Sequence, residues 1–86
     1  MKNTVNTMRD IYLISFKGLT TKFIFDSEPE TLGDLIQKYG KYGVNYIKYF
    51  DRSKDKFFKM SKDDVKRFFS YDTHTILELK KINYIK

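Results

Sequence analysis

The sequence predicts a single α+β domain in which a mixed sheet of about five strands packs on one main helix. Short runs of alternating apolar residues, typical of strands, flank a stripe with helical spacing at residues 32–39. The chain has 86 residues, which is room for one domain only. Phe and Tyr make up 17% of it, and this aromatic content argues against disorder because disordered chains are poor in such residues.

Two hairpins are expected, one on each side of the helix. Residues 11–17 alternate as a strand with apolar side chains on both faces, which indicates a central strand. Residues 22–26 form its partner strand across a short turn that contains glycine. Residues 45–51 and 56–60 form the second hairpin, joined by a polar turn.

Two helices are predicted from their capping patterns. The main helix begins near Thr31, after Pro29, because proline is not tolerated in a helix interior. Thr31 and Asp34 form a T-x-x-D cap, and Gly40 is the natural stop. A second, shorter helix follows the S-x-x-D capping box that begins at Ser61.

Residues 75–82 are predicted as the last strand, which completes the order β-β-α-β-β-α-β. Residues 1–9 have no hydrophobic period, so we expect a flexible N-terminal arm before a domain at 10–86. Replacing Leu35 by Ala should cost roughly 2–5 kcal/mol if that side chain is buried. The expected core side chains are Tyr12, Ile14, Phe16, Phe23, Phe25, Leu32, Leu35, Ile36, Ile47, Val65, Phe68, Leu77 and Leu79.

This order, in a chain of this length, resembles the ubiquitin-like β-grasp fold over about residues 10–82. Residues 28–32 are similar to the start of a ubiquitin-like helix. Residues 72–79 are similar to the polar turn and alternating run of a last ubiquitin-like strand. Because residues 82–86 contain no Gly-Gly pair, we do not expect a conjugated modifier.

Two groups of interaction modules within that superfamily are nearest in pattern. Residues 63–79 are similar to the end of the CIDE-type domains. Four aspartates have spacing similar to the acidic motif of the Phox/Bem-type domains, from which Ser53 and Lys54 depart: Asp51, Asp55, Asp63 and Asp64. Both groups bind proteins, so the resemblance implies protein–protein interaction, by analogy of fold.

Positive charge is concentrated in the second half of the chain. Residues 1–43 carry six basic and five acidic groups, whereas residues 44–86 carry eleven and six, so the halves contribute +1 and +5 to the net charge of +6. Such a half attracts an anionic partner. The expected partner-binding residues are Lys54, Lys56, Lys59, Lys62, Lys66 and Arg67.

We therefore expect a small, non-enzymatic protein–protein interaction module whose basic half steers an acidic protein partner. An exposed sheet edge would allow strand addition by that partner or a homo-oligomer. The abundance of Lys, Ile, Tyr and Phe suits an AT-rich coding source. A small protein of this composition fits a phage or mobile-element accessory protein that binds and modulates a host factor.

The alternative is a basic nucleic-acid-binding protein. Aromatic residues interleave with the lysines of the second hairpin, and nucleic-acid surfaces combine Lys or Arg for phosphates with aromatic rings for stacking. In this reading one of the adjacent residues Phe57 and Phe58 is exposed, because alternation sends their side chains to opposite faces. The interleaved aromatic residues are Tyr46, Tyr49, Phe57 and Phe58.

Catalysis, cofactors and metals are not expected. The chain has no Cys, and its one His, His74, lacks a recognisable nucleophile or orienting carboxylate. No phosphate-binding glycine motif occurs. The Asp-x-Ser-x-Asp run at 51–55 resembles the start of a calcium loop, but Lys56 and Lys62 stand where Gly and Glu are needed.

A cytoplasmic location without membrane association is expected. No stretch reaches the ~18 apolar residues of a transmembrane helix. Residues 1–10 lack the apolar centre of a signal peptide. A short basic turn around Phe68 and Phe69 offers little area for a membrane surface.

Overall fold

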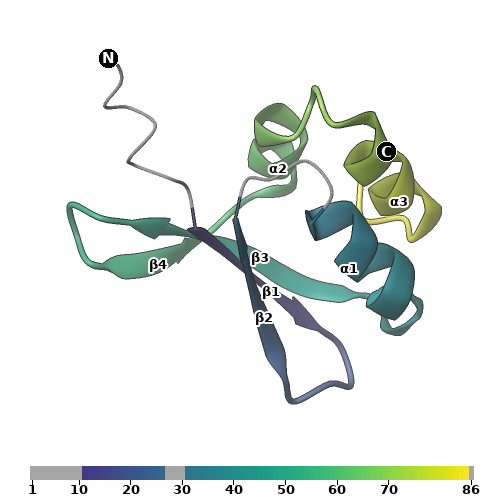
Figure 1. The fold of residues 1–86 in the computed structure, drawn as a ribbon, viewed down its shortest axis with the longest axis horizontal. Helices are drawn as coiled ribbons and strands as arrows, with labels where there is room; N and C mark the ends of the chain where they lie inside the picture. The colour runs from purple at the N-terminus through teal and green to yellow at the C-terminus, as the bar shows by residue number, and fades with distance from the viewer. Residues whose placement is uncertain (1–10, 27–30, 86) are drawn as a thin grey trace.

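The computed structural model describes residues 11–26 and 31–85, so the arm predicted at residues 1–9 lies outside the described residues. The chain is an α+β domain, as predicted (Figure 1). Its elements are β1 (Ile11–Phe16), β2 (Lys22–Asp26), α1 (Thr31–Tyr39), the 3-10 turn η2 (Gly40–Tyr42), β3 (Val44–Asp51), β4 (Lys56–Lys59), α2 (Lys62–Phe68) and α3 (Thr73–Lys81).

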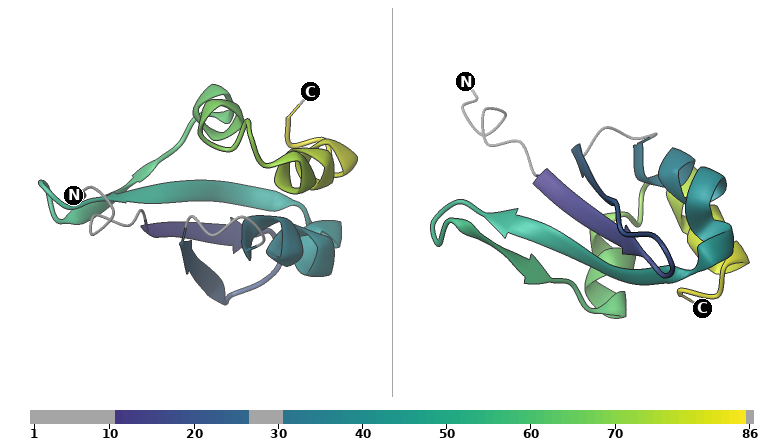
Figure 2. Two further views of the ribbon diagram at one scale, coloured as in Figure 1. Left: turned by 45° about the horizontal axis from the view of Figure 1, so that its top comes forward. Right: turned by 90° about the horizontal axis from the view of Figure 1, so that it is seen from below.

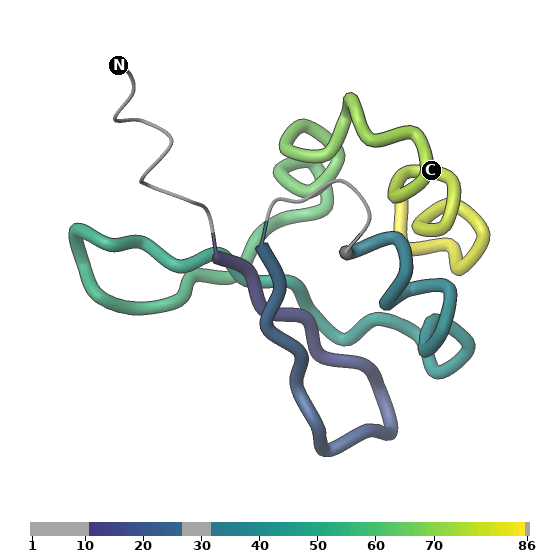
Figure 3. The backbone as a smooth tube through the Cα atoms, in the orientation of Figure 1, coloured from purple at the N-terminus to yellow at the C-terminus, as the bar shows by residue number. Residues whose placement is uncertain are grey.

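The sheet contains four strands in the order β2-β1-β3-β4, and every neighbouring pair is antiparallel. Both hairpins and the central position of β1 are confirmed. The predicted mixed sheet of five strands is wrong for the described residues, because no parallel pair and no fifth strand is present among them. The backbone trace in Figure 3 shows the two hairpins diverging from the centre of the molecule.

All three helices pack on one side of the sheet. Strand alternation turns Tyr12, Ile14 and Phe16 of β1 toward that side, where they are at most 3% exposed. They join a single apolar core with residues of each helix, among them Ile36 and Leu79. The opposite side of the sheet is here called the outer face, and the strand register places the alternate residues of each strand on it. Figure 2 shows the arrangement of the helices and the sheet from two further directions.

Helix α1 forms as its apolar spacing predicts. Leu32 and Ile36 are each only 1% exposed, while Leu35 and Tyr39 lie at the margin of the core and are partly buried. The cap predicted at Thr31 lies outside the described side chains. The capping box of α2 is confirmed, because Ser61 Oγ accepts from Asp64 N at 3.0 Å and an Asp64 carboxylate oxygen accepts from Ser61 N.

The segment predicted as the last strand is the helix α3. Asp72 caps it by accepting from the backbone N–H of Thr75 at 3.1 Å and from the Thr75 hydroxyl. Thr75, Glu78 and Leu79 are buried, which is the i, i+3, i+4 spacing of a helix. The order therefore ends β-β-α-α, and the ubiquitin-like arrangement is not confirmed.

This change of element also alters the core. Phe68 and Leu77, both predicted to be core residues, are 50% and 52% exposed. Phe69 takes the place of Phe68, because it is buried against Tyr12 with ring centroids 5.3 Å apart, whereas Leu79 is fully buried as expected. Val44, Met60 and Ile85 complete the core and were not expected there.

Candidate functional site

The β3–β4 hairpin projects beyond the rest of the sheet (Figure 1). Strand β1 pairs with β3 only as far as Tyr49, whereas β3 continues to pair with β4 through Phe50–Phe57 and Asp51–Lys56. The tip is held by Asp51, whose carboxylate accepts from the Ser53 N–H at 2.9 Å and from the Ser53 hydroxyl at 2.6 Å. The hydroxyl bond lowers the pKa of Asp51, so this turn keeps its carboxylate ionised.

Three neighbouring aromatic rings, two on the helix-facing side of the hairpin and one at the end of α2, are here called the aromatic row: Tyr49 of β3, Phe58 of β4 and Phe68 of α2. The Tyr49 ring centroid lies 5.9 Å from that of Phe58 and 6.4 Å from that of Phe68. Tyr49 and Phe58 are partly exposed, and Phe68 is half exposed. Part of the apolar surface of each ring is therefore open to solvent.

Two lysines at the hairpin tip lie close to Phe58, which is at one end of this row, with Tyr49 between it and Phe68. Lys54 Nζ is 5.3 Å and Lys56 Nζ 5.2 Å from the Phe58 ring centroid. Both distances are within the range of cation–π attraction, which holds the ammonium groups beside the ring. The tip therefore joins two positive charges to an apolar surface.

The other side of the hairpin belongs to the outer face and also combines rings with lysines. The Phe50 and Phe57 rings meet edge to face at 5.1 Å. Lys48 Nζ lies 4.8 Å from the Tyr46 ring centroid, and Lys48 pairs across the strands with Lys59. This side of the hairpin therefore also carries aromatic rings next to lysines.

Tyr46 connects this side to the far edge of the sheet. Burial alone would raise the pKa of the Tyr46 hydroxyl, but hydrogen bonds with Lys22 and Ser15 and the charges of Lys22 and Lys48 together lower it. Positive charge thus extends over the outer face as well as the hairpin.

The six sequence-predicted contact residues fall into three groups. Lys54 and Lys56 come together at the hairpin tip. Lys59 and Lys62 line a groove of about 540 Å³ between the end of β4 and the C-terminal turn. Lys66 and Arg67 lie in α2 and are exposed, and Arg67 pairs with Asp64 one turn earlier.

Individual partners distinguish these groups. Lys62 Nζ lies 5.6 Å from the ring centroid of Tyr84, and burial raises the pKa of that tyrosine. Lys17 lines the same groove from the first hairpin.

The sequence did not predict the basic residues Lys17 and Lys22 at this surface, because they are distant in the chain, and it predicted Phe68 in the core. Lys22 and Tyr46 lie on one face because each pairs with Ser15 of β1, a register that the tertiary fold sets.

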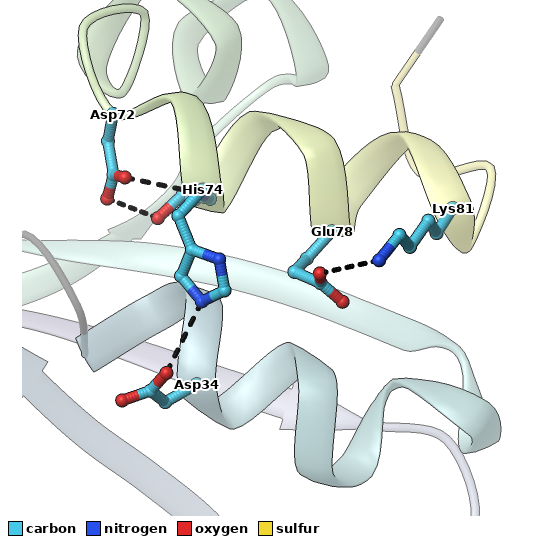
Figure 4. Close-up of polar contacts among 6 residues, drawn as sticks. Asp34, Asp72, His74, Glu78 and Lys81 are labelled. Atoms are coloured by element: carbon cyan, nitrogen blue, oxygen red, sulfur yellow. Dashed lines mark hydrogen bonds and ion pairs between the residues drawn. The ribbon is translucent and has the colours of Figure 1, made fainter.

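His74 lies between two helices (Figure 4). Its Nε2 is 3.3 Å from a carboxylate oxygen of Asp34, which joins α3 to α1, and both side chains are exposed. Nearby, Lys81 donates to Glu78 at 3.0 Å within α3. The expectation that His74 lacks a carboxylate partner is wrong, because Asp34 of α1 lies within hydrogen-bond distance of its ring.

Gly33 makes the close approach of α1 to α3 possible. A Cβ at this position would lie 2.3 Å from Cδ2 of the His74 ring, so a side chain here displaces the imidazole. We expect Gly33→Ala to gain about 1 kcal/mol of helix propensity in a His74→Ala background and clearly less in the wild type. Urea unfolding of the four proteins of this cycle measures the difference, and equal gains in both backgrounds would contradict the contact.

Within residues 11–26 and 31–85, no group of three or more His, Asp or Glu side chains could hold a metal ion. No helix in the same part of the chain is long and apolar enough to cross a membrane. Comparison with protein-family models finds no match, and no curated protein or solved structure is significantly similar to the chain. The function is therefore inferred from the surface itself.

Proposed function

We propose that this protein is a small binding protein without catalytic activity, and that its ligand is single-stranded nucleic acid. The observation that carries the proposal is the aromatic row beside the projecting hairpin, with Lys54 and Lys56 placed close to its end ring, Phe58. Single strands expose the faces of their bases, and these stack on aromatic side chains while lysines contact the phosphates.

The spacing of the lysines supports a strand that follows the edge of the sheet. Lys56 and Lys59 occupy the two ends of β4, which is an edge strand. At a rise of about 3.3 Å per residue their backbones are roughly 10 Å apart, and Lys62 continues the series at the start of α2. Lys56 lies on the helix-facing side of β4 and Lys59 on its outer side, so a strand that runs along this edge would contact both with its phosphates while its bases stack on the aromatic row.

A charge-reversal variant tests the proposal. We expect Lys54→Glu/Lys56→Glu to weaken binding of an oligonucleotide of about 15 residues by tenfold or more at low salt, because two phosphate contacts become repulsive. The matched control is Lys41→Glu/Lys80→Glu, which changes the net charge equally at two exposed positions in η2 and α3. Fluorescence anisotropy measures both variants, and equal losses would assign binding to net charge alone.

An acidic protein partner is the second candidate, and the edge position of β4 favours it. An acidic segment could add to this edge as a further strand, with its carboxylates opposite Lys56 and Lys59. A host factor bound by a phage or mobile-element protein would be a partner of this kind. This candidate predicts that an acidic strand-forming peptide competes for the hairpin while oligonucleotides do not bind.

A further inference from the structure

The opposite edge of the sheet, strand β2, has the charge pattern of a self-complementary strand. Its five residues read Lys-Phe-Ile-Phe-Asp, with Lys22 and Asp26 at the ends and Ile24 at the centre. Ile24 lies on the outer face and is 67% exposed. Natural edge strands are usually protected by inward charges, bulges or proline, and β2 contains none of these between its two ends.

We infer that two copies of this chain associate through antiparallel pairing of β2 with β2 around a twofold axis at Ile24. In this register Lys22 of each copy lies opposite Asp26 of the partner subunit, and the two Ile24 side chains face each other. Ile24 faces the same residue of the other copy, and each Lys22 faces an Asp26 across the twofold axis. The same surface is therefore used by both copies, and the assembly is complete as a dimer. The inference does not depend on the proposed function.

The side of β2 that faces the helices supports the same partner. A shallow groove of about 650 Å³ runs between this edge and α1, and it is lined by Ile24, Phe25 and Asp26 of β2 and by Asp34, Leu35 and Lys38 of α1. Pairing in this register places Phe23 of the partner subunit next to Phe25, at the border of that groove. Apolar contacts are therefore available on both faces of the new strand pair.

The second edge of the sheet does not share this pattern. Strand β4 has lysine at both ends, Lys56 and Lys59, and no acidic residue. Two copies of β4 would bring only positive charges together, which disfavours their association. The charge sequence thus selects β2 as the edge that pairs with itself. Such a dimer has a continuous sheet with the β3–β4 hairpin of each copy at its two ends.

Sedimentation velocity of the full chain over a range of concentrations tests the dimer. The wild type should sediment as a species of twice the 10.4 kDa chain mass. In Lys22→Asp both ends of β2 carry a carboxylate, and in Asp26→Lys both ends carry an ammonium group. Each variant alone would bring like charges together across the interface, and its dimer dissociation constant should rise about tenfold or more. An equimolar mixture of the two variants should regain the dimer, because opposite charges then face each other.

The mixture of the two variants distinguishes a weakened dimer interface from an effect of the substitution within a single chain. Lys22 also hydrogen-bonds to Tyr46 of its own chain, and mixing two variants cannot restore that bond. Ile24→Glu provides a second variant at an exposed position, where folding is little affected, and it should be monomeric. A monomeric wild type, or a dimer that none of these substitutions weakens, would overturn the inference.

Discussion

Phe16→Ala is expected to lower the free energy of unfolding by about 3–5 kcal/mol. Phe16 is 1% exposed and lies where β1, β2 and α1 meet, with its ring centroid 5.9 Å from that of Phe23 and 5.7 Å from that of Tyr39. Truncation removes these contacts and leaves a cavity that the backbone of a central strand cannot close. The loss is a large share of the roughly 5–15 kcal/mol that stabilises a domain.

Urea unfolding followed by circular dichroism measures this effect. Leu77→Ala is the informative control, because the sequence predicted a core position there and the structure leaves the side chain half exposed on α3. We expect a change within about 0.5 kcal/mol for this control. A large loss at Leu77 with little at Phe16 would show that α3 is misplaced. Leu35→Ala should lie between the two, since Leu35 is only partly buried.

Phe58→Ala is expected to weaken binding of a single-stranded oligonucleotide by roughly 5- to 150-fold, which corresponds to the 1–3 kcal/mol of one base–aromatic stack. Phe58 is an end ring of the aromatic row and the ring whose centroid lies within 5.3 Å of the ammonium groups of Lys54 and Lys56. Its removal therefore takes away a stacking surface and releases both lysines. Fluorescence anisotropy at constant salt measures the loss.

Phe57→Ala is the matched control for this variant. The two phenylalanines are adjacent in β4 and similarly buried, but Phe57 points to the outer side of the hairpin and packs on Phe50. If the aromatic row is the platform, the control should bind several-fold more tightly than Phe58→Ala. The opposite ranking would move the platform to the outer face.

The hairpins and the main helix could be predicted from the sequence because each has a local signal. Period-two alternation identifies β1, and the apolar spacing from Leu32 to Tyr39 identifies α1. The α3 segment was misread because a short apolar run such as Ile76-Leu77-x-Leu79 fits either a strand or a helix. Asp72, followed by Thr75, carries the capping signal that distinguishes them.

The candidate site could be predicted only in part, for a related reason. Lys54 and Lys56 follow from the basic hairpin, and alternation indicates that one of the rings beside them is exposed. Phe68 could not be placed there from its own pattern, because Phe68 and Phe69 are equally apolar and only the packing of α2 decides that Phe69 turns toward Tyr12. Likewise, the sequence alone does not indicate which lysines from distant parts of the chain lie together, because the tertiary fold determines this.

A salt-dependent titration of the purified protein against single- and double-stranded oligonucleotides tests the central claim most directly. Three phosphate contacts, for example from Lys54, Lys56 and Lys59, predict that single-strand affinity falls roughly 20-fold between about 50 and 200 mM salt, with weaker binding of duplex. Negligible binding of single strands at the lower salt concentration would contradict the account and favour an acidic protein partner.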